Sequence, residues 1–182
     1  MTEKNDEKPT ILMVDDVPDN LHMLMETLGD SYNYIPAKNG KSALRKAEKA
    51  HKLDLVLLDI MMPDMDGYAV LVALKKHPEL AKVPVIFITA VSEAMDQAKG
   101  FHLGAVDYVT KPFVPEIIKA RVATHVELKQ KTDLLEQLAT TDGLTKMYNR
   151  RKIDEILTSE FQRAKRSQSC LSLIMADIDH FK

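Results

Sequence analysis

Acidic residues end two of the apolar segments of this sequence. The segment "ILMVDD" (11–16) ends in Asp15 and Asp16, and the segment "LDLVLLD" (53–59) ends in Asp59. Ligands of a parallel α/β sheet bind beyond the carboxyl ends of its strands, so the three carboxylates should converge if both segments belong to one such sheet. Two carboxylates about 4 Å apart repel by about 4 kcal/mol at an effective dielectric of about 20. The cluster therefore favours a hard cation, and oxygen ligands without His or Cys favour Mg²⁺.

Two further polar side chains are expected at the same edge of the sheet. Thr89 ends the apolar segment "VPVIFIT", and Lys111 follows "AVDYVT". A carboxylate nucleophile, a divalent cation, a hydroxyl and a lysine together form a phosphoryl-transfer site. In such a site Asp59 attacks phosphorus, the cation and Lys111 neutralise the phosphoryl oxygens, and Thr89 binds one of them. Each residue alone has an ordinary alternative, such as helix capping for Asp or strand formation for Thr, but five at successive strand ends favour the site.

The elements that would position these residues alternate along the chain from Thr10 onward. Short apolar segments are followed by stretches with helical periodicity, and this alternation predicts a parallel sheet covered on both faces. The fold class is therefore α/β, a doubly wound five-stranded parallel sheet. The predicted helices cover residues 18–29, 39–51, 67–76, 92–102 and a long segment from 115 onward.

The last predicted helix is longer than the domain needs. It begins at Pro115 and contains no further Gly or Pro before Gly143, which corresponds to at least about 30 Å of helix. Mostly apolar residues recur three or four apart, although His125 and Thr132 interrupt the stripe. We expect the first half to pack on the sheet and the second half to project and pair with another helix. The alternative is a single amphipathic helix that lies on its own sheet.

A second unit is predicted from Thr140. It contains a loop, a helix and an apolar strand, "LSLIM" (171–175), followed by "DID". One helix and one strand cannot bury an independent core, so we expect the chain to be cut inside an incomplete second α/β domain. We expect this segment to be partly disordered or to borrow packing from a neighbour. Cys170, beside the apolar strand, is expected to be a buried, reduced thiol.

Composition limits the class of protein. The 182 residues are 45% hydrophobic and 29% charged, with a formal net charge of −2. The lack of a basic excess argues against nucleic acid as a partner. The apolar segments are too short to span a bilayer, and the polar N-terminus lacks the apolar core of a signal peptide. We therefore expect a cytoplasmic protein without a membrane partner.

The strand-end motifs carry a family resemblance. "VDD", "LLDIMMPDMDG", "ITA" and "KPF", at these spacings, resemble the flavodoxin-like receiver domain of two-component response regulators. The resemblance implies that Asp59 accepts a phosphoryl group from a histidine kinase or a phosphotransfer protein. It also implies that Mg²⁺ is bound by Asp16, Asp59 and the backbone carbonyl of Met61, with Asp15 acting through water.

The same resemblance implies how a phosphoryl group is read out. Tyr108 stands where receivers carry a switch aromatic, which swings inward as Thr89 moves toward the phosphoryl group. The alternative for Tyr108 is an ordinary half-buried strand tyrosine. The surface expected to change comprises the fourth helix, the last strand and the long last helix, which is a common dimerisation surface of this family. The peptide bond between Lys111 and Pro112 is expected to be cis.

Motifs after the long helix resemble a second family. "DGLTKMYNRR" and "DIDHFK" are similar to the start of a GGDEF domain, the diguanylate cyclase module that joins two GTP molecules into cyclic di-GMP. Lys146 and Met147 stand where the first motif usually has Gly-Leu. The resemblance implies that Asp177 is a metal ligand in the intact domain. The sequence contains no GGDEF or GGEEF signature, so we expect no cyclase activity from this fragment.

The predicted organisation is a disordered leader (1–9), a receiver domain (10–128), a helical linker (129–140) and a truncated N-terminal part of a GGDEF domain (141–182). We predict a phosphoacceptor receiver that controls dimerisation and, in a longer parent, diguanylate cyclase output. Two alternatives stay open. One is a Mg²⁺-dependent phosphatase-like hydrolase, which typically needs a second Asp where this chain has Met61. The other is a structural dimerisation module with an idle pocket.

Overall fold

The chain divides into two compact units, Met1–Lys131 and Thr132–Lys182. The computed structural model describes residues 8–90, 94–145 and 147–176, and it describes only the backbone of Thr89 and of residues 94–97. Most of the predicted leader therefore lies outside the described residues.

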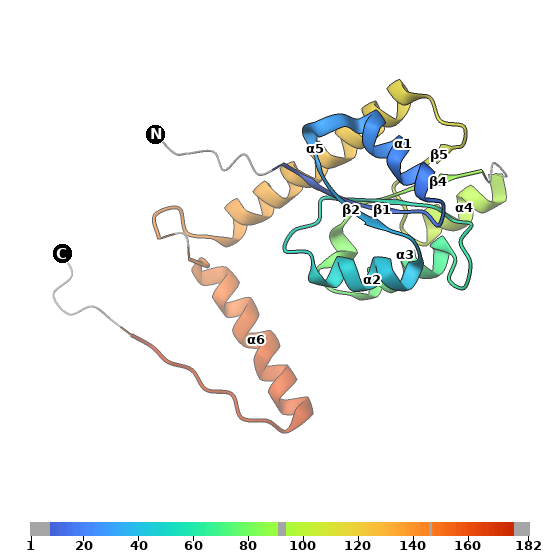
Figure 1. Ribbon diagram of the computed structural model, residues 1–182. Helices are drawn as coiled ribbons and strands as arrows, with labels where there is room; N and C mark the ends of the chain where they lie inside the picture. Colours follow the sequence, from blue (N-terminus) through green and yellow to red (C-terminus); the bar gives the residue numbers. More distant parts are fainter. Residues whose placement is uncertain (1–7, 91–93, 146, 177–182) are drawn as a thin grey trace. The chain divides into compact units, whose positions relative to one another are not determined.

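The first unit is a five-stranded parallel sheet with helices on both faces (Figure 1). The strand order is β2-β1-β3-β4-β5, and every neighbouring pair is parallel, which confirms the predicted fold class. The strands are β1 (Thr10–Val14), β2 (Asn33–Ala37), β3 (Leu55–Leu58), β4 (Val85–Thr89) and β5 (Asp107–Thr110). The helices are α1 (Pro18–Leu28), α2 (Gly40–Lys49), α3 (Gly67–Lys76), α4 (Ala94–His102) and the first part of α5 (Pro115–Thr140), with short 3₁₀ turns at Gly29–Ser31 and Leu80–Lys82.

Two hydrophobic cores lie on opposite faces of the sheet. Along β1, Ile11 and Met13 pack with residues of α1 and α5, whereas Leu12 and Val14 pack with residues of α2 and α3. Figure 1 shows the same division, with α1 and α5 on one side of the sheet and α2 and α3 on the other. Because both faces are covered, β3 is apolar at every position, and β1 and β4 are apolar except for one terminal threonine each, as is typical of parallel sheets.

Side-chain caps fix where two of the helices begin. The side chain of Asn39 accepts a hydrogen bond of 2.8 Å from the amide of Ser42 at the start of α2. The side chain of Asp66 accepts one of 2.7 Å from the amide of Ala69 at the start of α3. Each cap satisfies a backbone amide that the first turn of a helix leaves without a partner. These helix starts therefore follow directly from local sequence.

Helix α5 changes character along its 26 residues. Ile118, Val122 and Val126 are buried against the sheet, whereas Leu128 and the later leucines are exposed. The first half therefore packs on the sheet, as predicted. His125, which interrupts the predicted apolar stripe, has a largely buried side chain, and its Nε2 lies 3.3 Å from the carboxylate of Asp107. Neither α5 nor any other described helix is apolar enough over a sufficient length to cross a membrane.

The second unit contains the end of α5, a short turn and α6 (Arg150–Ser167). Thr141 and Tyr148 form an isolated antiparallel bridge that closes the turn. The side chain of Asn149 caps α6 by accepting a hydrogen bond of 3.0 Å from the amide of Lys152. The same side chain donates a bond of 2.9 Å to the carbonyl of Ala139. The predicted helix of this unit is thus present, and Asn149 ties its start to the end of α5.

Two expectations for the second unit are wrong. Residues 171–175 form no strand, and their side chains are exposed, with Ile174 at 92%. Cys170, which we expected to be buried, is also exposed. A strand needs a neighbour that accepts its backbone hydrogen bonds and covers its apolar side chains, and no described residue supplies one.

Two adjacent isoleucines of α5 test the packing of its first half. Ile118 is fully buried and Ile117 is 48% exposed. We expect Ile118→Ala to lower the free energy of unfolding by about 2–5 kcal/mol, because it opens a cavity between α5 and the sheet. The matched change Ile117→Ala should cost less than half as much in urea denaturation. Equal losses from the two variants would contradict this account of α5.

Candidate functional site

Strand register brings Asp15 and Asp59 side by side. Val14 and Leu58, the last residues of β1 and β3, are paired across the two parallel strands, and each is followed directly by an aspartate. The amide of Asp59 donates a hydrogen bond of 2.9 Å to the carbonyl of Val14, which extends the ladder by one residue. Asp15 and Asp59 are 2% and 7% exposed, so the sheet holds both carboxylates largely away from solvent.

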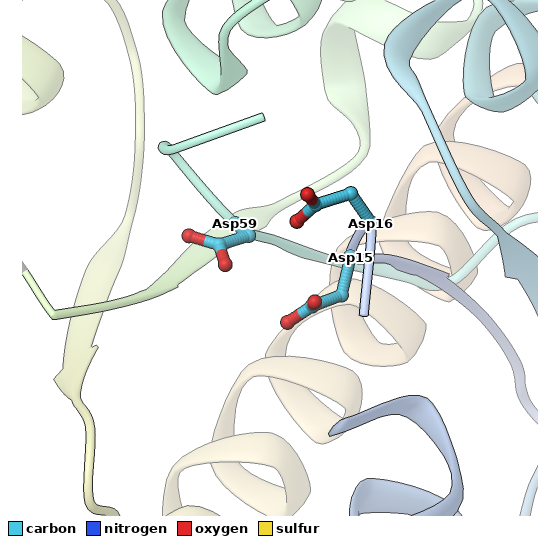
Figure 2. A group of neighbouring side chains, drawn as sticks. All are labelled: Asp15, Asp16 and Asp59. Atoms are coloured by element: carbon cyan, nitrogen blue, oxygen red, sulfur yellow. The ribbon is translucent and has the colours of Figure 1, made fainter. Parts of the chain in front are cut away.

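Asp16 completes a cluster of three carboxylates. One carboxylate oxygen of each of Asp15, Asp16 and Asp59 lies within 4.8 Å of the others. Figure 2 shows the three side chains leaving the two neighbouring strand ends toward one side. Asp16 is half-buried, so the cluster is open to solvent on its side. The structure thus brings together the three carboxylates that the sequence placed at strand ends.

The carboxylate of Asp15 is held by groups from its own segment. Its Oδ1 accepts a hydrogen bond of 2.9 Å from the amide of Val17. The side-chain amide of Asn20 lies 2.9 Å from both carboxylate oxygens. Sequence reasoning missed Asn20, because a polar residue in the first turn of a helix is usually only a solvated one. These contacts fix the orientation of Asp15.

Lys111 bridges two of the carboxylates. Its Nζ lies 2.7 Å from Oδ2 of Asp15 and 2.5 Å from Oδ2 of Asp59. Lys111 follows β5, and the peptide bond between it and Pro112 is cis, as the resemblance implied. Burial opposes the charge of Lys111, but its hydrogen bonds with Asp15 and Asp59 outweigh burial and raise its pKa.

Burial lowers the pKa of the Lys111 ammonium, but it acts in the opposite direction on the carboxyl group of Asp59. It raises the pKa of Asp59, and the charge of Asp15 adds to this effect. Hydrogen bonds from Lys111 and from the amide of Met61, the latter at 3.1 Å, partly offset it. The raised pKa of Asp59 favours a neutral acid, whereas that of Lys111 favours an ion pair. We favour the ion pair, because one ammonium lies within hydrogen-bond distance of two carboxylates.

The charges of the pocket fit a divalent cation. Three carboxylates face the single ammonium of Lys111 among the residues of this cluster, so negative charge remains uncompensated. All the ligand atoms are oxygens, and one side of the cluster is open to solvent. Mg²⁺ prefers such ligands, and it usually keeps several waters and shares its shell with a phosphate.

The other predicted site residues are placed less completely. Thr89 ends β4 and is paired with Thr110 of β5, so its backbone reaches the same edge as Lys111. Its side chain is not among those described. Met61 has an exposed side chain, while its amide is bound to Asp59. Asp177 lies outside the described residues.

A glycine lets α3 approach the acidic pocket. The amide of Gly67 donates a hydrogen bond of 2.9 Å to the carbonyl of Ile60. A Cβ at Gly67 would lie 2.3 Å from the backbone oxygen of Asp59, which is too close for any side chain. The start of α3 is therefore pressed against the chain that carries Asp59. Sequence reasoning placed Gly67 at the start of the predicted helix 67–76 but did not identify this close approach.

Tyr108 is buried rather than half-buried. Its exposed fraction is 8%, and its ring lies between those of Phe87 and Phe101, with both centroids at 5.1 Å. Phe101 belongs to α4 and Phe87 to β4. The ring of Tyr108 therefore connects the sheet with α4.

Comparison with known proteins identifies the family. The family model "Response regulator receiver domain" matches residues 11–123. The chain belongs to the response regulator receiver family. A second model, "Diguanylate cyclase, GGDEF domain", matches residues 139–182, after the receiver. Both resemblances drawn from the sequence are thus confirmed.

Curated relatives that are similar to this chain carry different names. A "Probable cyclic di-GMP phosphodiesterase" of Vibrio cholerae is 45% identical over 126 residues, 69% of this chain and 28% of the relative. A "Probable transcriptional regulator ycf27" of Cyanidium caldarium is 34% identical over 81% of this chain and 54% of the relative. This chain therefore spans about a quarter to a half of the length of these relatives.

Solved structures match the receiver over nearly their whole length. A putative response regulator from Chloroflexus aurantiacus is 33% identical, with a TM-score of 0.62 over 66% of this chain and 99% of that chain. The beryllofluoride-activated DrrB receiver domain is 34% identical, with a TM-score of 0.57 over 65% of this chain and 97% of that chain. Each likeness covers about two thirds of this chain.

If the acidic cluster binds Mg²⁺, the cation should stabilise the folded protein. We expect Mg²⁺ at about 100 times its dissociation constant to raise the free energy of unfolding by about 2.7 kcal/mol, because it binds only the assembled carboxylates. Asp16→Asn should remove most of this gain in chemical denaturation with and without Mg²⁺.

Asp30→Asn is the matched control, because it removes the same charge from an exposed residue after α1, at the opposite edge of the sheet. It should keep the full response to Mg²⁺. An equal response in the Asp16 variant would show that the cation binds elsewhere.

Proposed function

We propose that this receiver is a phosphoacceptor whose Asp59 takes a phosphoryl group from the phosphohistidine of a histidine kinase or a phosphotransfer protein. The observation that carries the proposal is the position of Asp59. Its carboxylate lies at the end of a buried strand, beside Asp15 and Asp16 and 2.5 Å from the ammonium of Lys111. This arrangement supplies a carboxylate nucleophile together with an ammonium that neutralises negative charge on the phosphoryl oxygens.

The transfer balances without any further reagent. A carboxylate oxygen of Asp59 attacks phosphorus, so an O–P bond forms while the P–N bond to the donor imidazole breaks. The imidazole keeps the electron pair and takes a proton from solvent. The ammonium of Lys111 neutralises charge on the phosphoryl oxygens, and the hydroxyl of Thr89 is proposed to bind one of them. Mg²⁺ held by Asp15, Asp16, Asp59 and the Met61 carbonyl would supply further charge neutralisation when bound.

The alternative functions are less well supported. A phosphatase-like hydrolase typically needs an acid two residues after the nucleophile, and Met61 offers only an exposed thioether side chain there. A purely structural module leaves unexplained why two buried carboxylates share one lysine. Burying charged groups costs free energy, and apolar residues at these positions would avoid that cost.

Phosphorylation of one aspartate is the direct test. We expect incubation with Mg²⁺ and a small phosphodonor such as acetyl phosphate to add one phosphoryl group, seen by intact mass and removed by hydroxylamine. Asp59→Asn should abolish the addition, because an amide cannot form the acyl phosphate.

Asp64→Asn is the matched control from the same loop. Asp64 is exposed and has a φ of 67°, a left-handed conformation that Asn adopts as readily as Asp. This variant should be phosphorylated like the wild type. Equal phosphorylation of the Asp59 variant would overturn the proposed acceptor.

We further propose that the surface of α4, β5 and α5 pairs with a second copy on phosphorylation. Phe101, Val114 and Ile117 are each about half exposed on this surface and border a pocket of about 350 Å³. The carboxylate of Asp107 and the guanidinium of Arg121 form an ion pair beside them. An apolar patch rimmed by charges is typical of a protein–protein interface. Tyr108 would link this surface to Asp59.

The second half of α5 is proposed to extend the pairing. Leu134, Leu135 and Leu138 are 55%, 66% and 68% exposed. Apolar residues at such spacing suit a helix that pairs with its copy in a coiled coil. Paired helices would bring two GGDEF domains together, as the joining of two GTP molecules into cyclic di-GMP requires.

Cyclase output is proposed for the longer parent rather than for this fragment. Support for it comes from the match of residues 139–182, with Asp177 as the proposed metal ligand, and not from the receiver. Relatives with a similar receiver carry names as different as phosphodiesterase and transcriptional regulator. A receiver alone therefore does not define its output.

Pairing can be measured by light scattering. We expect Mg²⁺ with beryllofluoride, a mimic of the aspartyl phosphate, to double the molar mass of the wild type. Asp59→Asn should keep the mass it has without these additions. A rise in both proteins would contradict a link between Asp59 and pairing.

A further inference from the structure

Gly100 of α4 lies against the hydroxyl end of the Tyr108 side chain. A Cβ built on Gly100 would lie 1.4 Å from Oη and 2.6 Å from Cζ of Tyr108, and 3.1 Å from Cε2 of Phe87. Real Cβ atoms essentially never approach another heavy atom within 3.0 Å. The buried position of Tyr108 therefore requires a residue without a side chain at position 100. Glycine in the interior of a helix is less stabilising than alanine. The close approach of Tyr108 explains why α4 nevertheless has glycine at this position.

The ring of Tyr108 packs against two other aromatic rings, and it also borders the pocket of about 350 Å³. Phe87 and Phe101 each lie 5.1 Å from it, centroid to centroid. Phe87 is in turn 5.3 Å from Tyr68, the second residue of α3, and the ammonium of Lys99 lies 4.2 Å above the Tyr68 ring. Packed rings transmit a displacement rather than absorb it. A side chain at position 100 must therefore turn Tyr108 outward or lift α4.

We infer that Gly100 is a positioning residue that sets the buried position of Tyr108, whatever the state of Asp59. Its functional consequence rests on the proposed function, in which the surface of α4, β5 and α5 responds to Asp59 through Tyr108. A side chain at position 100 should then separate two properties. Asp59 accepts its phosphoryl group as before, but the surface no longer presents the arrangement that pairs.

The physical contact is tested by a double-mutant cycle. Gly100→Ala is measured in the wild type and in Tyr108→Leu, which removes both ring atoms that the new Cβ would meet. We expect the urea midpoint of unfolding to fall in the wild type and to rise in the Tyr108→Leu protein. There the two contacts below 3.0 Å are gone, the Phe87 ring at 3.1 Å can shift by the few tenths of an ångström required, and the better helix propensity of Ala takes effect. If Gly100→Ala alone does not fold, recovery of folding by the second substitution supports the same contact.

Gly143→Ala is the control for the loss of a glycine. A Cβ at Gly143 would meet nothing within 4 Å. Its effect on the midpoint should be the same with Tyr108 and with Leu at position 108. A shift of equal sign and size for Gly100→Ala in both backgrounds would overturn the inference.

The position of the ring is read separately by ¹⁹F NMR of fluorotyrosine-labelled protein, with Tyr108→Phe to assign the signal. We expect the Tyr108 signal of Gly100→Ala to become accessible to a soluble paramagnetic quencher. A signal as protected as in the wild type would overturn the inference.

Two further measurements separate this inference from the proposed function. Gly100→Ala should gain a phosphoryl group from acetyl phosphate at the wild-type rate, yet lose the doubling of mass with beryllofluoride. If the wild type takes up no phosphoryl group, the proposed function is overturned, and the double-mutant cycle still tests the contact between Gly100 and Tyr108. If that cycle shows no coupling between the two positions, the role of Gly100 is overturned, and the phosphorylation of Asp59 is unaffected.

Discussion

Repulsion between carboxylates held at neighbouring strand ends is the constraint on which the rest of the site depends. The pairing of Val14 with Leu58 forces Asp15 and Asp59 together, and Asp16 follows in the same turn. A buried sheet cannot relax this arrangement, because a shift of register would break ladders that apolar side chains cover on both faces. The charge must be balanced by other groups. Lys111 balances part of it, and a divalent cation and a phosphoryl group are suited to the remaining space.

The same rigidity connects the pocket with a distant surface. Gly67 lets α3 begin against the backbone of Asp59, and Tyr68, the next residue, starts a series of packed rings that reaches Tyr108 and α4. Glycine thus allows two elements to approach closely at Gly67 and at Gly100. A change of charge at the strand ends would be transmitted through close-packed contacts, which have few intermediate arrangements.

Local patterns predicted much of this structure. Continuous apolar segments gave the strands, and their last residues gave the carboxylates and the lysine, because strand ends are local features. The contacts of Gly67 and Gly100 could not be predicted, since each depends on how separate elements pack against one another. The contact of Asn20 with Asp15 is local, but its residue type alone does not distinguish it from a solvated side chain. Tertiary context also decided the failures in the second unit. Residues 171–175 form no strand and Cys170 is exposed, because no described strand lies beside them.

The central claim is that the three carboxylates form one cation site at which Asp59 is the acceptor. Its most direct test is a crystal structure of the protein with Mn²⁺, which replaces Mg²⁺ at oxygen sites, and beryllofluoride. Anomalous scattering should show one Mn²⁺ peak among Asp15, Asp16 and Asp59, with beryllofluoride bonded to Asp59 and in contact with Lys111. A peak elsewhere, or beryllofluoride on another residue, would contradict the account.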